Sequence, residues 1–149
     1  MTSTKTFVYR IPTNEFVDKE MKQQNKPTAA ELEILTVLWD RKKATVREVF
    51  DAISETKRTT YTTVLKFLQI MQEKGLVERD VKEKAHVYRP RQTQMQTRSN
   101  LVGDLLEKAF RGSALGLVQH VLETKPTTPE ELAAIRRLIN EAEAKGGVK

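Results

Sequence analysis

The side chains with the clearest chemical potential lie in a stretch that has no carboxylate. Between Thr56 and Gln72 the only charged residues are basic, and threonines stand among them. Threonine hydroxyls and long basic side chains donate hydrogen bonds to phosphate oxygens and base edges, and threonine methyls contact thymine methyls. The candidate DNA contacts in this stretch are Arg58, Thr60, Tyr61, Thr62, Thr63 and Lys66.

Other kinds of chemistry lack the residues they need. The chain has no cysteine and only two histidines, His86 and His120, which lie far apart. Disulfides, thiolate nucleophiles and thiolate metal sites are therefore excluded, and a histidine-rich metal site is not expected. The scattered glycines form no phosphate-binding loop, and no nucleophile stands beside a base. We therefore expect no enzymatic activity, no metal and no cofactor.

Composition and charge are those of a small soluble globular protein. The chain has 149 residues, of which 38% are hydrophobic and 31% charged, and a formal net charge of +6. A positive net charge permits nucleic-acid binding without establishing it. No apolar run is long enough to span a membrane, and the first residues lack the apolar core of a secretory signal. The expected location is the bacterial cytoplasm.

The elements that must position these side chains begin with two capping boxes. Thr28 and Glu31 form the first, and Thr45 and Glu48 the second, so helices are expected over 28–42 and 45–55. A third helix is expected from Thr59 or Thr60 to Lys74, with a buried stripe at Tyr61, Val64, Leu65, Leu68 and Met71. Gly75 suits the left-handed position that ends such a helix.

A change of period after Gly75 predicts a β-hairpin. Residues 76–81 and 85–89 alternate by two, with 82–84 between them and Pro90 at the end. Three helices followed by a hairpin are the elements of a winged helix-turn-helix, in which the third helix enters the major groove. The wing adds further candidate DNA contacts, which are Lys82, Lys84, His86 and Arg89.

The remaining chain is expected to form two helices after a polar connection over 91–98. The first is interrupted or kinked between Gly112 and Gly116, and a capping box at Thr128 begins the second. Two helices are too few to bury both apolar stripes, and an isologous dimer would cover them. The expected dimer interface comprises Leu105, Leu106, Phe110, Val118, Val121, Leu122, Leu132, Ile135 and Ile139.

These patterns divide the chain into three parts and give a mainly α fold. Residues 1–27 are expected to be a flexible extension, with Met21 as an alternative start. Residues 28–91 are expected to form the winged helix-turn-helix domain, and residues 92–149 a two-helix dimerisation domain.

Several motifs together resemble one family. They are PTAAELEIL from Pro27 with Leu38-Trp39, YTTVL from Tyr61, EKGLV from Glu73 and VYRP from Val87. In this combination they resemble the penicillinase-repressor family, the bacterial β-lactamase and methicillin-resistance repressors, over residues 27–142. The resemblance implies a homodimeric repressor that binds an inverted-repeat operator.

The resemblance also implies roles by matching position. It implies that Thr62, Thr63 and Lys66 contact bases or phosphates. Arg58 and Thr60 would support them, and Trp39 would belong to the core. Members of the family that respond to β-lactams are cut at an Asn-Phe bond by a membrane sensor protease. The aligned pair here is His120-Val121, which argues against such a protease as a partner.

Two other functions fit the same elements. A winged helix can act as a protein-interaction module with no affinity for DNA. A related winged-helix regulator can sense a small ligand, which would require an apolar pocket with convergent polar groups.

Overall fold

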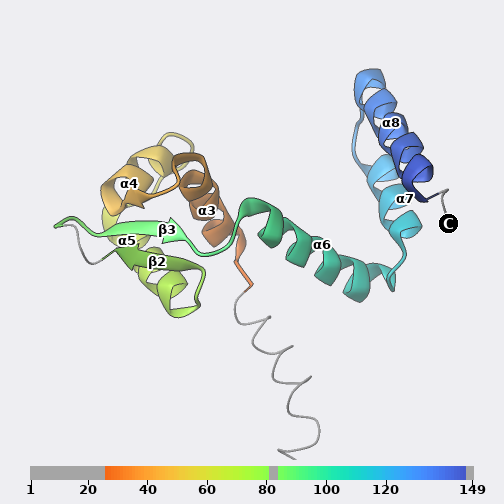
Figure 1. Ribbon diagram of the computed structural model, residues 1–149. Helices are drawn as coiled ribbons and strands as arrows, with labels where there is room; N and C mark the ends of the chain where they lie inside the picture. The colour runs from red at the N-terminus through yellow and green to blue at the C-terminus, as the bar shows by residue number, and fades with distance from the viewer. Residues whose placement is uncertain (1–25, 81–83, 147–149) are drawn as a thin grey trace, which may run out of the picture. The chain divides into compact units, whose positions relative to one another are not determined.

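The computed structural model describes residues 26–80 and 84–146 and shows a mainly α-helical chain (Figure 1). The expected extension over 1–27 lies almost entirely outside these residues. The helices are α3 (Ala29–Arg41), α4 (Val46–Ser54), α5 (Tyr61–Glu73), α6 (Gln94–Phe110), α7 (Ala114–Thr124) and α8 (Pro129–Gly146). The strands are β1 (Ala44–Thr45), β2 (Val77–Asp80) and β3 (Val87–Pro90). By packing, the chain divides into two compact units between Leu101 and Val102.

Local hydrogen bonds start the first two helices where the sequence predicts. The Thr28 hydroxyl accepts from the Glu31 N–H, and the Glu31 carboxylate accepts from the Thr28 N–H. Thr45 and Glu48 repeat the arrangement at α4. The bonds from the Thr45 backbone and side chain hold the pKa of Glu48 below its usual value, because they favour the charged carboxylate.

The wing contains one strand more than the hairpin that the sequence predicts. β3 pairs with β2 and also, on its other edge, with β1, and both pairings are antiparallel. β1 is only two residues long, Ala44 and Thr45, which is too short to show an alternating pattern. It fixes the wing to the start of α4 through the pairs Ala44–Tyr88 and Thr45–Val87.

The core of the first unit lies between α3, α4, α5 and the sheet. Figure 1 shows these helices grouped around β2 and β3. The residues that are fully buried or nearly so come from every one of these elements: Ile34, Leu35, Leu38, Ala44, Val46, Val49, Ile53, Val64, Leu68, Met71, Val77, Val87 and Tyr88. Val64, Leu68 and Met71 are one face of α5, so the opposite face of that helix is left to solvent.

The polar connection predicted over 91–98 is wrong, because α6 already begins at Gln94. Thr93 and Gln96 form a capping box in which each side chain accepts from the other residue's N–H. The segment is polar but packed, since Thr97 is buried. Trp39 is half-buried against the core, as expected, and its indole N–H donates to the Gln92 carbonyl at 2.9 Å. This bond ties the start of α6 to α3.

The interruption expected between Gly112 and Gly116 is a complete break. Arg111 and Gly112 have φ of 50° and 81°, and α7 begins afresh with Ser113 as its cap. Three helices therefore follow the wing in place of the expected two. Thr128 caps α8 by accepting from the Glu131 N–H.

A buried carboxylate joins the beginning of α3 to the end of α5. Glu31 is 3% exposed, and its Oε1 lies 2.6 Å from the Lys74 Nζ. The same ammonium group donates to the Lys26 carbonyl at 3.2 Å. Glu31 thus has two roles: it completes the cap of α3, and it neutralises the partly buried Lys74.

We expect Glu31→Ala to lower the free energy of unfolding by about 2–4 kcal/mol, because it removes a cap and leaves Lys74 without its buried partner. Urea denaturation measures the change. Glu33→Ala is the matched control, since Glu33 pairs with Lys57 at 3.1 Å where both side chains are about half exposed. That control is expected to cost less than about 1 kcal/mol. Equal losses in the two variants would show that Glu31 acts only as a surface charge.

The hydroxyl of Tyr88 is buried and has no hydrogen-bond partner among the described residues. A buried polar group without a partner destabilises the folded state, so its removal is not costly. Tyr88→Phe is therefore expected to leave the melting temperature unchanged or to raise it by a few degrees, as calorimetry would measure. A fall in melting temperature as large as that caused by removing a satisfied hydrogen bond would contradict this account.

Candidate nucleic-acid interface

The start of α5 is shaped by hydrogen bonds between two threonines. The Thr60 hydroxyl accepts from the Thr63 N–H at 3.1 Å and donates to the Thr63 hydroxyl at 2.9 Å. Thr60 is therefore the cap of this helix, as well as an exposed candidate contact. Because these bonds fix the first turn, the side chains that follow Thr60 project from a defined backbone.

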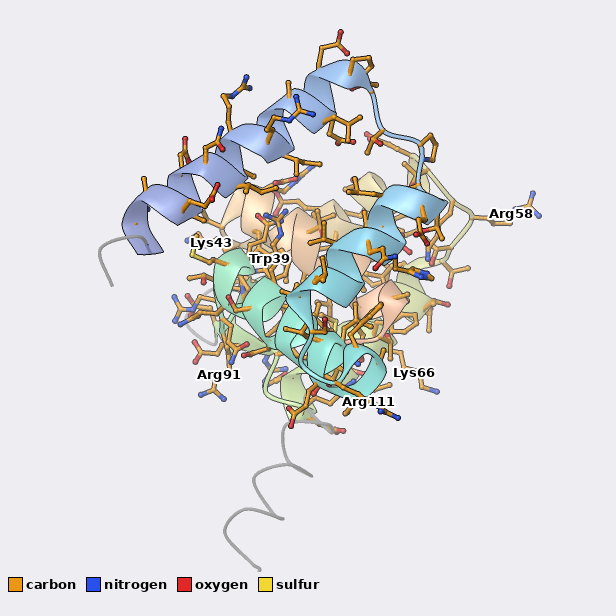
Figure 2. The ribbon with its side chains drawn as sticks, turned by 90° about the vertical axis from the view of Figure 1, so that its right-hand side faces the viewer. Trp39, Lys43, Arg58, Lys66, Arg91 and Arg111 are labelled. Atoms are coloured by element: carbon orange, nitrogen blue, oxygen red, sulfur yellow. The ribbon has the colours of Figure 1, made fainter. Side chains whose placement is uncertain are left out.

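The exposed face of α5 carries the side chains that the sequence singles out. Thr62, Thr63 and Lys66 are all exposed and lie opposite the buried residues of the helix. Arg58 is exposed in the turn that precedes α5, and Figure 2 shows it extending away from the ribbon. Within residues 26–80 and 84–146, neither Arg58 nor Lys66 has a carboxylate within ion-pair distance. The third basic residue of the stretch, Lys57, is held by Glu33.

Tyr61 does not belong to the buried stripe in which its spacing placed it. Its side chain is 43% exposed, and its ring meets the Phe50 ring edge-on with a centroid distance of 6.3 Å. The reason is its place in the first turn of α5, where it reaches the edge of α4 and not the core. Its expected membership of the DNA-contact set is compatible with this exposure.

The wing places its basic side chains less uniformly than the sequence suggests. Lys84 and His86 are exposed, whereas Lys82 lies outside the described residues. Arg89 is exposed but lies opposite Glu78 in the strand register, and the two side chains approach to 3.4 Å. The pair is half exposed and therefore weak enough to exchange for a phosphate.

Arg91 is a basic residue of the wing that the sequence analysis missed. Its Nε lies 3.5 Å from the same Glu78 carboxylate, on the other oxygen. The alternation that marks a strand gives no cross-strand register, so this pairing could be found only from the antiparallel ladder. Glu78 therefore holds two arginines at the base of the wing.

The helical residues after Leu101 leave most of their large apolar side chains exposed. No residue of α7 or α8 is buried. Among the nine residues expected in an interface, Leu106, Phe110 and Ile135 are half-buried. The exposed ones are Leu105, Val118, Val121, Leu122, Leu132 and Ile139. The apolar residues Val102, Leu115 and Leu138 are exposed as well.

His120 and Val121, the pair aligned with the family's cleaved bond, lie on α7 and are exposed. The His120 ring meets the Phe110 ring edge-on at a centroid distance of 5.9 Å. This contact is between α7 and the end of α6, within the second unit.

Other kinds of ligand would need a metal cluster or a pocket among the described residues. These residues contain no group of three or more histidine, aspartate or glutamate side chains placed to hold a metal ion. A cavity between α3, α4 and α5 is lined by Ile34, Ile53, Val64 and Phe67 and has a volume of about 20 Å³. That is room for about one water molecule. A larger hollow of about 400 Å³ is open to solvent and is lined by Gln92, Thr93, Met95, Gln96, Ser99 and Asn100. No helix among these residues is long and apolar enough to cross a membrane.

The chain is similar to several known proteins. A transcriptional regulator BlaI of Mycobacterium tuberculosis is 33% identical over 116 residues, which are 76% of this chain and 83% of that protein. The methicillin resistance regulatory protein MecI of Staphylococcus aureus is 20% identical over 113 residues, covering 76% and 92% of the two chains. The apo structure of MarR from E. coli has a TM-score of 0.45 and 18% identity, over 86% of this chain and 91% of that chain.

The family model described as penicillinase repressor matches residues 27–141. The matched range contains every described helix and strand except the last residues of α8. The resemblance stated from the motifs is therefore confirmed, and the chain belongs to the penicillinase repressor family.

Proposed function

We propose that the protein is a transcriptional repressor that binds an inverted-repeat operator as a homodimer. The observation that carries the proposal is the exposed face of α5, where Lys66 lies beside Thr62 and Thr63 and forms no ion pair with any carboxylate in the described part of the chain. Residues 28–91 are the proposed DNA-binding domain and residues 92–149 the proposed dimerisation domain. The names of the relatives, a transcriptional regulator and a resistance regulatory protein, support the same role.

In this proposal α5 lies in the major groove and the wing contacts the backbone beside it. Thr62, Thr63 and Lys66 face base edges or phosphates, since the N-terminal residues of a recognition helix are those closest to the bases. Arg58 precedes them and reaches a phosphate. Lys84, His86 and Arg89 contact phosphates or the adjacent minor groove from the wing. Lys82 and Tyr61 complete the proposed set.

The dimer of the proposal covers the apolar surface of the second unit. Exposed leucines, valines and isoleucines on α6, α7 and α8 would be removed from water by the same surface of a second copy. A two-fold dimer presents two copies of α5, so its operator contains two half-sites about one helical turn apart.

The charge of Lys66 on α5 tests the proposed DNA interface. Lys66→Ala is expected to weaken binding to operator DNA, by roughly equal factors on all sequences if it contacts a phosphate and with relaxed specificity at one position if it contacts a base. Fluorescence anisotropy with the promoter upstream of the protein's own gene measures both, over a range of salt. For the wild type we expect roughly a thousandfold loss of affinity or more between 50 and 200 mM salt.

The matched control is Lys57→Ala. It removes a positive charge from the same stretch of sequence, but the side chain it removes is already paired with Glu33. Its effect is expected to be smaller. Unchanged affinity in a variant carrying both Lys66→Ala and Arg58→Ala would remove α5 from the DNA interface. Binding that is insensitive to salt, or no binding at low salt, would favour a protein-interaction module in place of the repressor.

Charged substitutions in the second unit test the proposed dimer. Leu105→Glu or Val118→Glu is expected to dissociate it, because each buries a charge in an apolar interface. Light scattering at micromolar concentration measures the mass. Glu107→Lys, an exposed charge change on the same helix as Leu105, is the control and is expected to remain dimeric. If both glutamate variants kept the mass of the wild-type dimer at the same concentration, the interface would lie elsewhere.

A further inference from the structure

The side chains of Arg47, Phe50 and Tyr61 lie together where α4 packs against α5. The Phe50 ring meets the Tyr61 ring edge-on at 6.3 Å, with an angle of 68° between the planes. The Arg47 guanidinium carbon lies 5.6 Å from the centroid of the same Phe50 ring. Phe50 is half-buried against the core, so its own position is fixed. A rigid aromatic ring therefore holds an arginine and a tyrosine at one seam.

The polar ends of both outer side chains remain available. Tyr61 is 43% exposed, and the Arg47 side chain is 70% exposed. Arg47 forms an ion pair with Asp51, one turn further along α4, with an Nε to Oδ1 distance of 3.4 Å, and the Asp51 side chain is 60% exposed. Such an exposed pair is weak and is screened by salt, so an incoming phosphate can replace the carboxylate.

The other acid of α4, Glu48, already has partners of its own. Its carboxylate accepts from the Thr45 N–H in the capping box, and its other oxygen lies 3.8 Å from Arg41. It therefore does not compete for Arg47. The seam carries the positive charge of one guanidinium group and the donor hydroxyl of one phenol, which is the chemistry that recognises a phosphate oxygen.

We infer that Arg47 and Tyr61 together hold one phosphate of the DNA backbone at the seam between α4 and α5, with Phe50 as the platform that positions them. The inference rests on the proposed DNA binding and adds Arg47 to its contacts. In a helix-turn-helix the first helix of the pair crosses the backbone while the second enters the groove. A contact at the seam fixes how deeply and at what angle α5 enters, and it carries no sequence information of its own.

The test compares two duplexes, a footprinted operator and an unrelated sequence, by anisotropy over a range of salt. Arg47→Gln is expected to weaken binding to both by a similar factor, roughly 10- to 100-fold near 0.1 M salt, and to reduce the salt slope by about one per protomer. Tyr61→Phe retains the edge contact and loses the donor, so about three- to tenfold of affinity is expected to be lost on both duplexes.

Phe50→Leu tests the platform itself, since leucine keeps the apolar stripe of α4 but removes the ring. It is expected to weaken binding and reduce the salt slope in the same direction as Arg47→Gln. Its urea midpoint reports any loss of stability separately, because a merely structural role would change the midpoint and leave the slope alone. If Phe50→Leu kept the wild-type affinity and salt slope, the claim that Phe50 positions Arg47 and Tyr61 would be wrong.

Arg137→Gln is the matched control, because it makes the same charge change on α8, on the side opposite Ile135 and Ile139. It is expected to keep the wild-type slope. If Arg47→Gln behaves like this control while the wild type binds the operator, the phosphate contact is wrong and the proposed function stands. A change in the ratio of the two affinities would also overturn it, since that would mean a base contact. A wild type that binds neither duplex would end both proposals.

Discussion

The burial of one face of α5 is the constraint on which the first unit depends. Val64, Leu68 and Met71 are at most 2% exposed and pack against α3, α4 and the sheet. Because this face of α5 is buried, only its other side is exposed, and the residues there include Thr62, Thr63 and Lys66. The same packing fixes α4 against α5, so the turn that holds Arg58 and the seam that holds Phe50 are determined with it. One face of α5 therefore belongs to the core, and its other face forms the candidate interface.

The charges around that interface are arranged by pairing as much as by composition. Lys57, Arg89 and Arg91 each lie against a carboxylate, as Lys74 does more deeply at Glu31. Most of these pairs are half exposed and contribute little to stability, so they mainly orient the side chains. Arg58 and Lys66 lack such partners in the described residues. The stretch without acids is therefore the part of the surface where positive charge is least neutralised.

The two units solve the problem of apolar burial in different ways. The first has a core that its own helices and strands supply. In the second, no residue of α7 or α8 is buried, although α7 carries repeated leucines and valines and α8 repeated leucines and isoleucines. A homodimer would account for this surface, because helices too few to cover each other gain cover from a second copy. On the proposed function, dimerisation also sets the spacing of the two recognition helices.

What the sequence determined by itself is local in origin. The capping boxes at Thr28 and Thr45 join residues three apart, and the apolar period of each helix repeats within one or two turns, so both could be found from the sequence. The exposed face of α5 and the resemblance to the family followed from the same patterns. Only the tertiary structure decided the exposure of Tyr61, the pairing of Arg89 and Arg91 with Glu78, and the hydrogen bond from Trp39 to Gln92. These features depend on contacts between residues far apart along the chain. A local pattern in the sequence does not specify the register or the packing of such residues.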